Sequence, residues 1–574
     1  MKKLFLTAAL ILVLTTQAGP ASAAYHHEGE KDADKFLAAY PATAGTKLDH
    51  CALCHSGGQY EKKPGQWVKV GSCQWCHMTY GYDGAGDIAQ TMNPYGAAFK
   101  QAGRNTAAVV AINDQDSDGD GYSNQAEILA DRFPGDPADD PSKKEAPYRI
   151  YTMAQIKALG AHTQFLLMNS SRNNDAYHQY TGLPLDELLD DVGALPGSTG
   201  LSVFAPDGWS LYHPLDEVAD PSLYHVNGVY PASSFYYDQE ADMALNAADG
   251  WCDYGSPFAK GRNHLDPINN PDGLKLILSY LMDGQVLEPG QLNADNKLDG
   301  DGPFRVVAPQ KTPGPPDQSS TAANQAVVWP YNNDGDHSNG YSTRSVTIIR
   351  VEPLAAGDTD VDTMEAGWNF VDQEKIMVYG GIDGTDSNGN SVLDSEEKLD
   401  DVSDFNGDGV PDYQDPKTTR LRQAEGAEKI LLNVSAGAFA EVQALGANDP
   451  ALPQAGKPAA PLPFGAFKFL VTGLTPGQSV TLTMVFPASV PTTALLYKVN
   501  AAGEWKSVSF GSNDGDATIT VTLKDGDPDT DGDGTANGTI DDPITLATPF
   551  IPTGIGGSGS GNGDSGCFVS TLGR

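Results

Sequence analysis

The sequence predicts a multidomain protein, with a small α-helical domain near the N-terminus, an α+β domain in the centre and an antiparallel β-sandwich near the C-terminus. Three observations predict this order. The chain has 574 residues, which corresponds to about three or four domains of ordinary size. Motifs of cysteine and histidine are confined to an early segment, and alternating apolar and polar residues are concentrated after position 478. The 63 glycines and 39 prolines indicate frequent turns.

The N-terminus has the pattern of a secretory signal. Lys2 and Lys3 precede the apolar run LFLTAALILVL, and the small residues ASA occupy positions 21–23. The run is too short to anchor the chain across an apolar bilayer core of ~30 Å, and no later run reaches ~20 apolar residues. We therefore expect an exported protein without a transmembrane segment after signal cleavage, located in the periplasm, on the outer-membrane surface or outside the cell.

The charge excludes some partners. With 36 basic and 75 acidic side chains, the formal net charge is −39. The charge therefore disfavours binding to nucleic acid or to an anionic bilayer by general electrostatic attraction, and we expect no nucleic-acid partner. A basic protein partner is favoured instead.

Two short stretches contain the same motif. DHCALCHSGG and GSCQWCHMTY each contain two cysteines separated by two residues and followed directly by histidine. The distance between the two pairs also fits a zinc site with four thiolate ligands, and a C-x-x-C pair alone also fits a redox dithiol. Three features argue against these alternatives: the histidine after each pair, export to an oxidising compartment, and the lack of a βαβ pattern.

The C-x-x-C-H spacing is that of covalent c-type haem attachment. Two thioethers join the two vinyl groups on one edge of the porphyrin, and the adjacent histidine turns under the ring to bind iron. We expect two haems. The predicted tethers and proximal ligands are Cys51, Cys54 and His55 for one haem, and Cys73, Cys76 and His77 for the other.

The sixth iron ligands are less well specified by the sequence. His26 and His27 lie at the start of the mature chain, and they are the leading candidates for folding back over either ring. His50 and Met78 adjoin a motif, so that each would reach only the other haem, and Met92 is a further candidate. Two histidine ligands give a lower reduction potential than histidine with methionine.

Residues 116–127, DSDGDGYSNQAE, match a calcium-binding loop position by position. Gly121 stands where the loop turns sharply, and Tyr122 contributes a backbone carbonyl. A hard cation needs six to eight oxygens that converge from alternate positions of such a loop. The expected ligands are Asp116, Asp118, Asp120, Tyr122, Asn124 and Glu127.

Three later loops follow the same pattern less closely. In the first, Ser391 replaces the turn glycine; the last ends in Ile540, so that Asp541 or Asp542 would have to complete it. These loops resemble thrombospondin type 3 or dockerin repeats, and extracellular calcium at ~10⁻³ M saturates weak sites of this kind, so we expect them to stiffen linkers. The expected ligands are Asp386, Asn388, Asn390, Asp394 and Glu397; Asp404, Asn406, Asp408, Asp412 and Asp415; and Asp529, Asp531, Asp533 and Asn537.

The two C-x-x-C-H motifs, the stretch NPYGAAFKQAGRN at 93–105 and the first calcium loop together resemble the GEGP-motif-containing diheme c-type cytochromes. GDGPFR at 300–305 has Asp301 where the name of that family has glutamate. The resemblance covers roughly residues 25–355. It implies a small α-helical diheme cytochrome c domain with an EF-hand-like calcium loop, and electron transfer as the activity.

The central region has a second resemblance. Residues 180–210 alternate an amphipathic helix with a strand, and LKLILSYLMDGQVLEP followed by DGPFRVVAPQ predicts a helix, a turn and a strand. This pattern is similar to the molybdopterin-binding domain of sulfite oxidases, in which an early cysteine ligates molybdenum. Here the corresponding stretch FLLMNSSRNN has no cysteine, and Cys252 lies much later. We therefore do not expect molybdopterin to be bound, and we expect Arg305 to form a structural salt bridge.

The C-terminal third has a different residue pattern from the rest of the chain. SVTLTMVFP, ALLYKVN, WKSVSF and ATITVTL alternate apolar and polar residues, as strands of a β-sandwich do. With the acidic loop that follows, this segment resembles the choice-of-anchor U domain, which implies surface display without catalysis. The tail GGSGSGNGDSGCFVSTLGR is a flexible linker that contains Cys567, the predicted point of surface attachment.

The expected organisation is a signal peptide (1–23), a diheme cytochrome c domain with a calcium loop (24–147), a sulfite-oxidase-like domain (148–355), a connector with calcium loops (356–420), a choice-of-anchor β-sandwich (421–550) and a sorting tail (551–574).

Three functions follow from this organisation. The leading hypothesis is a calcium-stabilised diheme cytochrome that relays single electrons between redox proteins or to extracellular acceptors. The first alternative is a sulfite-dehydrogenase-like oxidoreductase that uses a molybdopterin cofactor, and the second is a calcium-dependent structural or adhesion protein of the cell surface. We assign no catalytic residue, and an electron-transfer protein is favoured over a catalyst.

Overall fold

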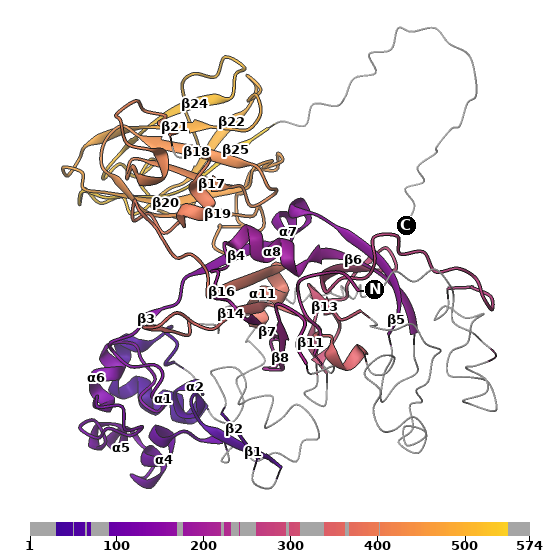
Figure 1. Cartoon of the computed structure of the whole chain (residues 1–574). Coiled ribbons are helices and arrows are strands. Elements are labelled where there is room, and N and C mark those ends of the chain that lie inside the picture. Colours follow the sequence, from indigo (N-terminus) through magenta and orange to yellow (C-terminus); the bar gives the residue numbers. More distant parts are fainter. Residues whose placement is uncertain are drawn as a thin grey trace, which may run out of the picture. The chain divides into compact units, whose positions relative to one another are not determined.

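The computed structural model describes most of the chain (Figure 1). The described residues are 30–49, 51–63, 66–69, 91–168, 176–219, 223–230, 240, 260–293, 298–309, 338–361, 367–400 and 402–548. The chain divides into two compact units, Met1–Lys429 and Ile430–Arg574. Among the described helices, none is long and apolar enough to cross a membrane.

The first unit begins with short helices around a small apolar core. Asparagine side chains start two of these helices: Asn93 accepts a hydrogen bond from Gly96 N at 2.8 Å, and Asn105 accepts one from Ala108 N at 3.0 Å. The core includes Phe36, Leu53, Tyr95, Phe99, Val109, Ile112 and Ile128. The elements are α1 (Glu30–Ala39), η1 (Pro41–Thr43), α2 (Ala52–His55), the hairpin β1 (Gln59–Lys63) and β2 (Gln66–Lys69), α4 (Pro94–Gln101), α5 (Thr106–Ala111) and α6 (Asn124–Leu129).

Two five-stranded sheets form the centre of the first unit. One has the order β4-β16-β14-β7-β8, in which only β14 and β16 are parallel. The other has the order β10-β9-β6-β5, with β13 also paired to β9. Their strands are β4 (Tyr148–Thr152), β5 (His162–Met168), β6 (Ala176–Pro184), β7 (Gly200–Phe204), β8 (Ser210–Pro214), β9 (Ile277–Met282), β10 (Gln285–Val286), β13 (Arg305–Val307), β14 (Ile348–Glu352) and β16 (Lys375–Gly380).

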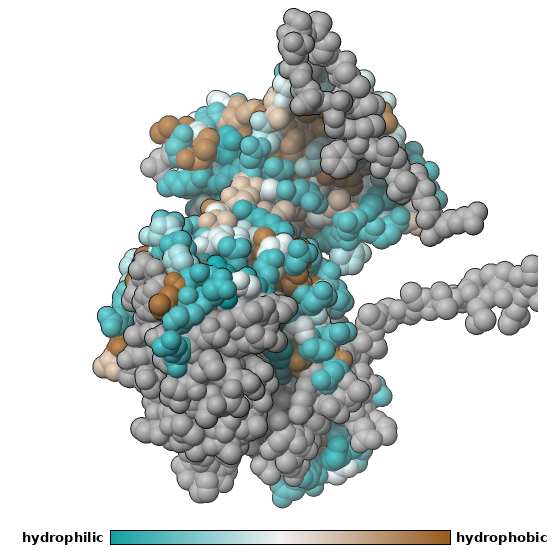
Figure 2. All heavy atoms as spheres, turned by 90° about the vertical axis from the view of Figure 1, so that its right-hand side faces the viewer, coloured by the Kyte–Doolittle hydropathy of each residue, from teal (hydrophilic) through white to brown (hydrophobic). Residues whose placement is uncertain are grey.

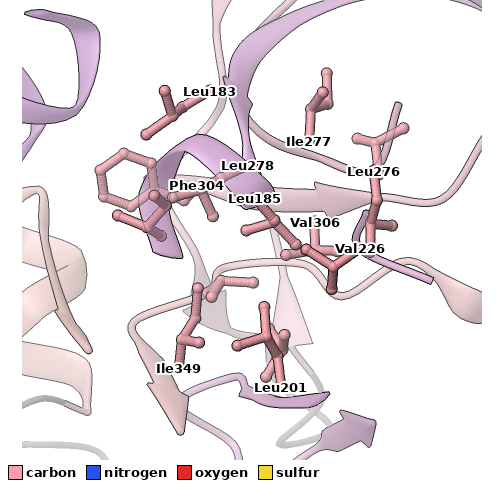
Figure 3. Packing of buried hydrophobic residues seen from close by; sticks show 14 of the residues in the cluster. Leu183, Leu185, Leu201, Val226, Leu276, Ile277, Leu278, Phe304, Val306 and Ile349 are labelled. Carbon is pink, nitrogen blue, oxygen red and sulfur yellow. The ribbon is translucent and has the colours of Figure 1, made fainter. Parts of the chain in front are cut away.

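One hydrophobic core joins the two central sheets. Leu183 and Leu278 come from one sheet, Leu201 and Ile349 from the other, and Leu185 from α8 (Leu185–Val192) between them (Figure 3). Helix α8 buries its apolar face and ends at Gly193, whose φ of +77° is the left-handed conformation that glycine adopts readily. Helix α7 (Met153–Leu159) begins with a capping box formed by its N-cap residue and Gln155.

Short elements complete the first unit. They are β3 (Lys144–Glu145) paired in parallel with β15 (Asp358–Thr359), β11 (Gln291–Leu292) paired with β12 (Leu298–Asp299), η4 (Ser338–Tyr341), α11 (Trp368–Gln373), α12 (Asp394–Glu397), η5 (Asp412–Gln414) and β17 (Thr418–Arg422).

The second unit contains two antiparallel sheets. β18 (Lys429–Val434) pairs with β21 (Ser479–Val485), which pairs with β24 (Thr518–Lys524). The other sheet has the order β19-β20-β25-β22-β23, with β19 (Ala438–Leu445), β20 (Ala466–Thr472), β22 (Leu495–Val499), β23 (Trp505–Val508) and β25 (Ile540–Ala547). Alternate residues of β21, such as Val480, Leu482 and Met484, are buried, as the alternating sequence predicts.

The predicted fold class, taken as a whole, is wrong. The described residues contain more strand than helix, distributed over several sheets, and the N-terminal residues do not form a separate small helical domain. The helices of that segment are short, and the segment belongs to the same compact unit as the central sheets. Asp139 helps to join them: it accepts hydrogen bonds from Lys47 at 2.8 Å and from Thr359 Oγ1 at 2.9 Å, and all three residues are buried.

The central α+β prediction also misassigned an element. The apolar run that begins at Leu274, predicted to be a helix, contains strand β9, which turns at Gly284 into β10. Residues Ile277–Tyr280 are buried in succession because both faces of this strand are covered, and a short continuous apolar run does not distinguish such a strand from a buried helix. The helix and strand expected within 180–210 are present as α8 and β7, and the two antiparallel sheets of the second unit are compatible with the predicted sandwich.

Candidate haem pocket and calcium loops

The structure describes one of the two C-x-x-C-H motifs. Cys51, Cys54 and His55 belong to the described part of the chain. The second motif, with Cys73, Cys76 and His77, lies outside the described residues, as do His26, His27, His50, Met78, Cys252 and Cys567. Met92 is the one proposed sixth ligand that is described.

Asn93 holds the first motif in place. The motif forms a single turn, helix α2, and the buried side chain of Asn93 donates hydrogen bonds to the carbonyl oxygens of Leu53 at 3.0 Å and Ser56 at 2.8 Å. The backbone N–H of Asn93 donates to the carbonyl oxygen of Cys54 at 2.8 Å. The same side chain caps α4, so one residue aligns α4 with the cysteine-containing turn.

Close packing reinforces this alignment. A Cβ atom at Gly96, on α4, would lie 2.7 Å from the carbonyl oxygen of Cys54 and 2.8 Å from Cγ of Met92. Gly96 therefore allows α4 to approach the motif more closely than any other residue would.

The motif opens into a pocket with about 900 Å³ of empty space, part of which is open to solvent. The walls are mainly apolar and aromatic, as a porphyrin requires, and charged side chains are included. The lining residues are Asp32, Ala33, Phe36, Cys51, Leu53, Cys54, His55, Met92, Tyr95, Gly96, Phe99, Lys100, Arg104 and Val109.

The ring of His55 is held in a fixed orientation. Its side chain is buried, and its Nδ1 lies 2.9 Å from Thr91 Oγ1. In the tautomer with the proton on Nδ1, this nitrogen donates to the hydroxyl and Nε2 keeps the lone pair that a metal needs. Burial lowers the pKa of His55 to about 4, so the imidazole is neutral at neutral pH.

The structure describes both cysteines of the first motif. Cys51 and Cys54 are not joined by a disulfide bond. Both line the pocket beside His55, and burial raises the pKa of the Cys54 thiol to about 12. The residues present therefore fit a covalently attached haem.

Sequence reasoning missed three residues of this site. Thr91 contacts His55, Asn93 fixes the turn, and Tyr95 lines the pocket with a buried hydroxyl that has no hydrogen-bond partner among the described residues. The Asn-Pro pair at 93–94 is the usual start signal of a helix and would have identified the cap. The other two contacts depend on tertiary packing and have no local signal.

The first calcium loop has the geometry of a cation site. Carboxylate oxygens of Asp116, Asp118 and Asp120 lie within 4.8 Å of one another. Asp116 accepts hydrogen bonds from Gly119 N at 2.7 Å and Gly121 N at 3.0 Å, which closes the loop.

Glu127, the last position of that loop, is a buried carboxylate. Among the described residues, neither of its oxygens has a hydrogen-bond partner, and Asp118 and Asp120 each have one buried oxygen without a partner. Burial and the neighbouring carboxylates raise the pKa of Glu127 to about 9 and that of Asp118 to about 7. Unpartnered, mutually repelling buried oxygens are the arrangement that a bound calcium ion would satisfy.

The loops at 386–397 and 404–415 repeat the backbone pattern of the first. In each, the first aspartate accepts hydrogen bonds from the N–H groups of the fourth and sixth positions, and the ninth side chain accepts one from the second N–H. Ser391 replaces the turn glycine and adopts its left-handed conformation, with φ of +70°. Asn388 and Asn390 donate hydrogen bonds to Glu397, and Asn406 donates one to Asp415, so the predicted ligands of each loop converge.

The last loop differs from the others. The N–H groups of Gly532 and Gly534 donate to the carbonyl oxygens of Asp541 and Asp531, and neither bonds to the side chain of Asp529. Asp531 instead accepts from Gly526 N at 2.8 Å, and Asn537 donates to Asp533 at 2.7 Å. Asp542, one of the two residues considered for completing the loop, forms an ion pair with Lys498.

The first calcium loop and the pocket share structural elements. The side-chain amide of Asn124, the ninth loop position, donates to the carbonyl oxygen of Ile112 at 2.8 Å, at the end of α5. The same helix contributes Val109 to the pocket wall. Helix α5 and its C-cap residue Ile112 therefore contact both the loop and the pocket.

In the central region, Arg305 forms the structural ion pair expected from the sequence. Its guanidinium group lies 3.0 Å from Asp301 and also donates to Asn339, and it is buried. Of the stretch FLLMNSSRNN, residues 165–168 belong to β5, and the remainder lies outside the described residues.

Comparisons with protein-family models, with curated proteins and with solved structures gave no match.

Proposed function

We propose that this protein is an exported c-type cytochrome that carries two haems and relays single electrons, with calcium stabilising the chain around them. The observation that supports this proposal best is the convergence of Cys51, Cys54 and a buried, neutral His55 on one apolar pocket. Such a haem supplies an iron that accepts and releases one electron at a time.

In this proposal each residue has a defined task. Cys51 and Cys54 tether the first haem, and His55 holds its iron through Nε2 while Thr91 orients the ring. Phe36, Leu53 and Phe99 exclude water from the porphyrin faces. Cys73, Cys76 and His77 have the corresponding tasks for the second haem, and His26, His27 and Met92 remain the candidates for sixth ligand.

The test is to count haems on the purified mature protein. A pyridine haemochrome spectrum and mass spectrometry are expected to report two c-type haems per chain. The double variant Cys51→Ser/Cys54→Ser is expected to retain one haem, and so is Cys73→Ser/Cys76→Ser. Cys252→Ser is the matched control, because it removes a thiol outside both motifs and leaves two haems.

One zinc per chain without visible absorption would contradict the proposal. Equal haem content in the wild type and both double variants would also contradict it, because the motifs would then not be the attachment sites.

A second candidate function, a calcium-dependent structural protein of the cell surface, is favoured by the repeated backbone pattern of the loops at 386–397 and 404–415. The rate of haem reduction and reoxidation distinguishes the two proposed functions. An electron carrier is reduced and reoxidised rapidly by small-molecule reagents, whereas a structural protein with incidental haem reacts slowly.

A further inference from the structure

The C-terminal unit contains a lysine and an aspartate that are completely buried against each other. Lys498 on β22 and Asp542 on β25 form an ion pair, and both side chains have 0% exposure. Lysine and aspartate side chains are almost never fully buried unless they are paired.

The register of the sheet brings the two side chains together. β22 and β25 are adjacent and antiparallel, and Lys498 stands opposite Ile544, two residues from Asp542. Residues two positions apart on a strand share a face, so Asp542 is the diagonal neighbour of Lys498, within reach of a long side chain. Leu496, Ile540 and Ile544 of the same two strands are also buried.

No third group supports the pair. Among the described residues, neither Lys498 Nζ nor either carboxylate oxygen of Asp542 makes a hydrogen bond of ordinary geometry. A buried ion pair is stable only when further hydrogen bonds satisfy the remaining protons and lone pairs. Burying these two charges without further hydrogen bonds is therefore unfavourable. A neutral amide in the same place avoids this cost because it has no charge.

We propose that Lys498 and Asp542 are a modification site, at which they join in an intramolecular isopeptide bond between Nζ and Cγ. A proton first moves from the ammonium to the carboxylate, which gives a neutral amine and a carboxylic acid. The amine nitrogen then attacks Cγ, the bond from Cγ to one oxygen breaks, and that oxygen leaves as water with two hydrogens. The step needs no oxidant and no co-reactant.

The surroundings favour this reaction. The two reacting groups are already in contact, and neither side chain is exposed to solvent. The dry interior also protects the product, because hydrolysis needs water at the bond. The bond would join β22 to β25 and would link two residues whose positions differ by 542 − 498 = 44, which restricts the unfolded chain as a disulfide does.

The experiment is peptide mapping of the full mature protein by mass spectrometry. Trypsin is expected not to cleave after Lys498, and the peptide with Lys498 is expected to be joined to the peptide with Asp542 at a mass about 18 Da below their sum, the mass of one water. Because the mapping concerns two peptides of the C-terminal unit, its result is independent of haem attachment. Recovery of both peptides separately, with their full masses, would overturn the proposal.

Two variants separate the bond from the ion pair. Lys498→Arg keeps the positive charge but is expected to yield separate peptides and a lower melting temperature. Lys506→Met is the control. Lys506 lies on β23, next to β22, and forms an exposed ion pair with Glu504. Loss of this lysine is expected to leave the joined peptides intact. If Lys498→Arg does not fold, the map of the wild-type protein still decides the question.

Discussion

At the scale of single residues, the candidate haem site depends on Asn93 as much as on the cysteines. This side chain is fully buried, and it joins the motif to α4 through hydrogen bonds on both sides. A Cβ atom at Gly135 would lie 2.4 Å from Cγ of Asn93, so the amide is also enclosed by the chain behind it. The motif alone does not specify how the turn is held.

Replacing Asn93 with alanine tests this role. The carbonyl oxygens of Leu53 and Ser56 would lose their partner, and each buried unsatisfied group costs about 1–3 kcal/mol. We expect Asn93→Ala to lower the free energy of unfolding by that order and to reduce the fraction of chains with haem at the first motif. Urea denaturation and haem quantification measure these effects.

Asn105→Ala is the matched control. Asn105 caps α5 in the same way but is exposed and makes no hydrogen bond to the motif. The Asn105→Ala substitution should reduce the free energy of unfolding slightly and leave the haem content unchanged. Equal effects of both substitutions would contradict the role assigned to Asn93.

His213 on β8 gives the structure a specific pH dependence. It is 1% exposed, its Nδ1 lies 3.2 Å from the carbonyl oxygen of Tyr224, and burial lowers its pKa to about 4 from an ordinary value of 6.5. Between these values the unfolded chain binds a proton that the folded chain does not. This residue therefore destabilises the fold as pH falls from 6.5 to about 4, by on the order of 3 kcal/mol.

Urea denaturation at pH 7 and pH 5 measures this effect. We expect the wild type to lose stability at pH 5 and His213→Gln to lose less, because glutamine does not titrate. An identical loss in both proteins would show that other groups control the pH dependence.

At the scale of elements, the predicted calcium loops are connected to neighbouring helices and strands. The loop at 116–127 follows α5 and ends in the first turn of α6, and the loop at 386–397 ends in α12. Glu396, next to the last ligand of the second loop, forms an ion pair with buried Arg149 of β4 at 3.0 Å.

Calcium removal should lower stability. Chelation is expected to decrease the melting temperature by several degrees, because unpaired carboxylates then repel one another in the first loop. In Asp118→Asn, the difference between calcium-loaded and chelated protein should be smaller.

Asp114→Asn is the control, because Asp114 is exposed, lies just before the loop and involves the same change of charge. Differential scanning calorimetry with and without chelator measures all three proteins. A melting temperature that does not respond to chelation in the wild type would remove the proposed role of calcium.

At the scale of the whole molecule, the acidic charge defines how partners approach. The formal net charge is −39, and hydrophilic side chains (teal) cover much of the described surface in Figure 2. Charged proteins attract partners of opposite sign over distances set by the ionic strength. A basic redox partner is therefore expected to associate rapidly.

Salt dependence tests this expectation. Raising the ionic strength from about 0.01 M to about 0.1 M shortens the screening length from about 30 Å to about 10 Å. Reduction by hexaammineruthenium(II), a cation, should become slower, and oxidation by ferricyanide, an anion, should become faster. Stopped-flow spectroscopy measures both rates, and a change in the same direction for both would exclude a steering role for the net charge.

Strand predictions that depend on local sequence patterns agree with the structure, whereas predictions that depend on contacts between distant residues do not. The strands β21, β22, β23 and β24 were predicted because each has alternation or a short apolar run between turn residues, and the calcium loops were predicted because their ligands recur at fixed intervals. The helix predicted from Leu274 was wrong, because burial on both faces of β9 removes the periodic signal. The predicted separate helical domain failed because Asp139 and the pairing of β3 with β15 connect residues more than 200 positions apart.

The sequence alone determined the chemistry that this chain offers: two C-x-x-C-H motifs, the spacing of carboxylates in the calcium loops and the acidic charge. These features are local or additive, so they do not depend on how the chain folds. Only the tertiary structure decided that Cys51, Cys54 and His55 meet Phe99 and Val109 around one pocket, and that Lys498 and Asp542 face each other in a dry core. Such contacts depend on which distant segments pack together, and that packing reflects the free energy of the whole fold.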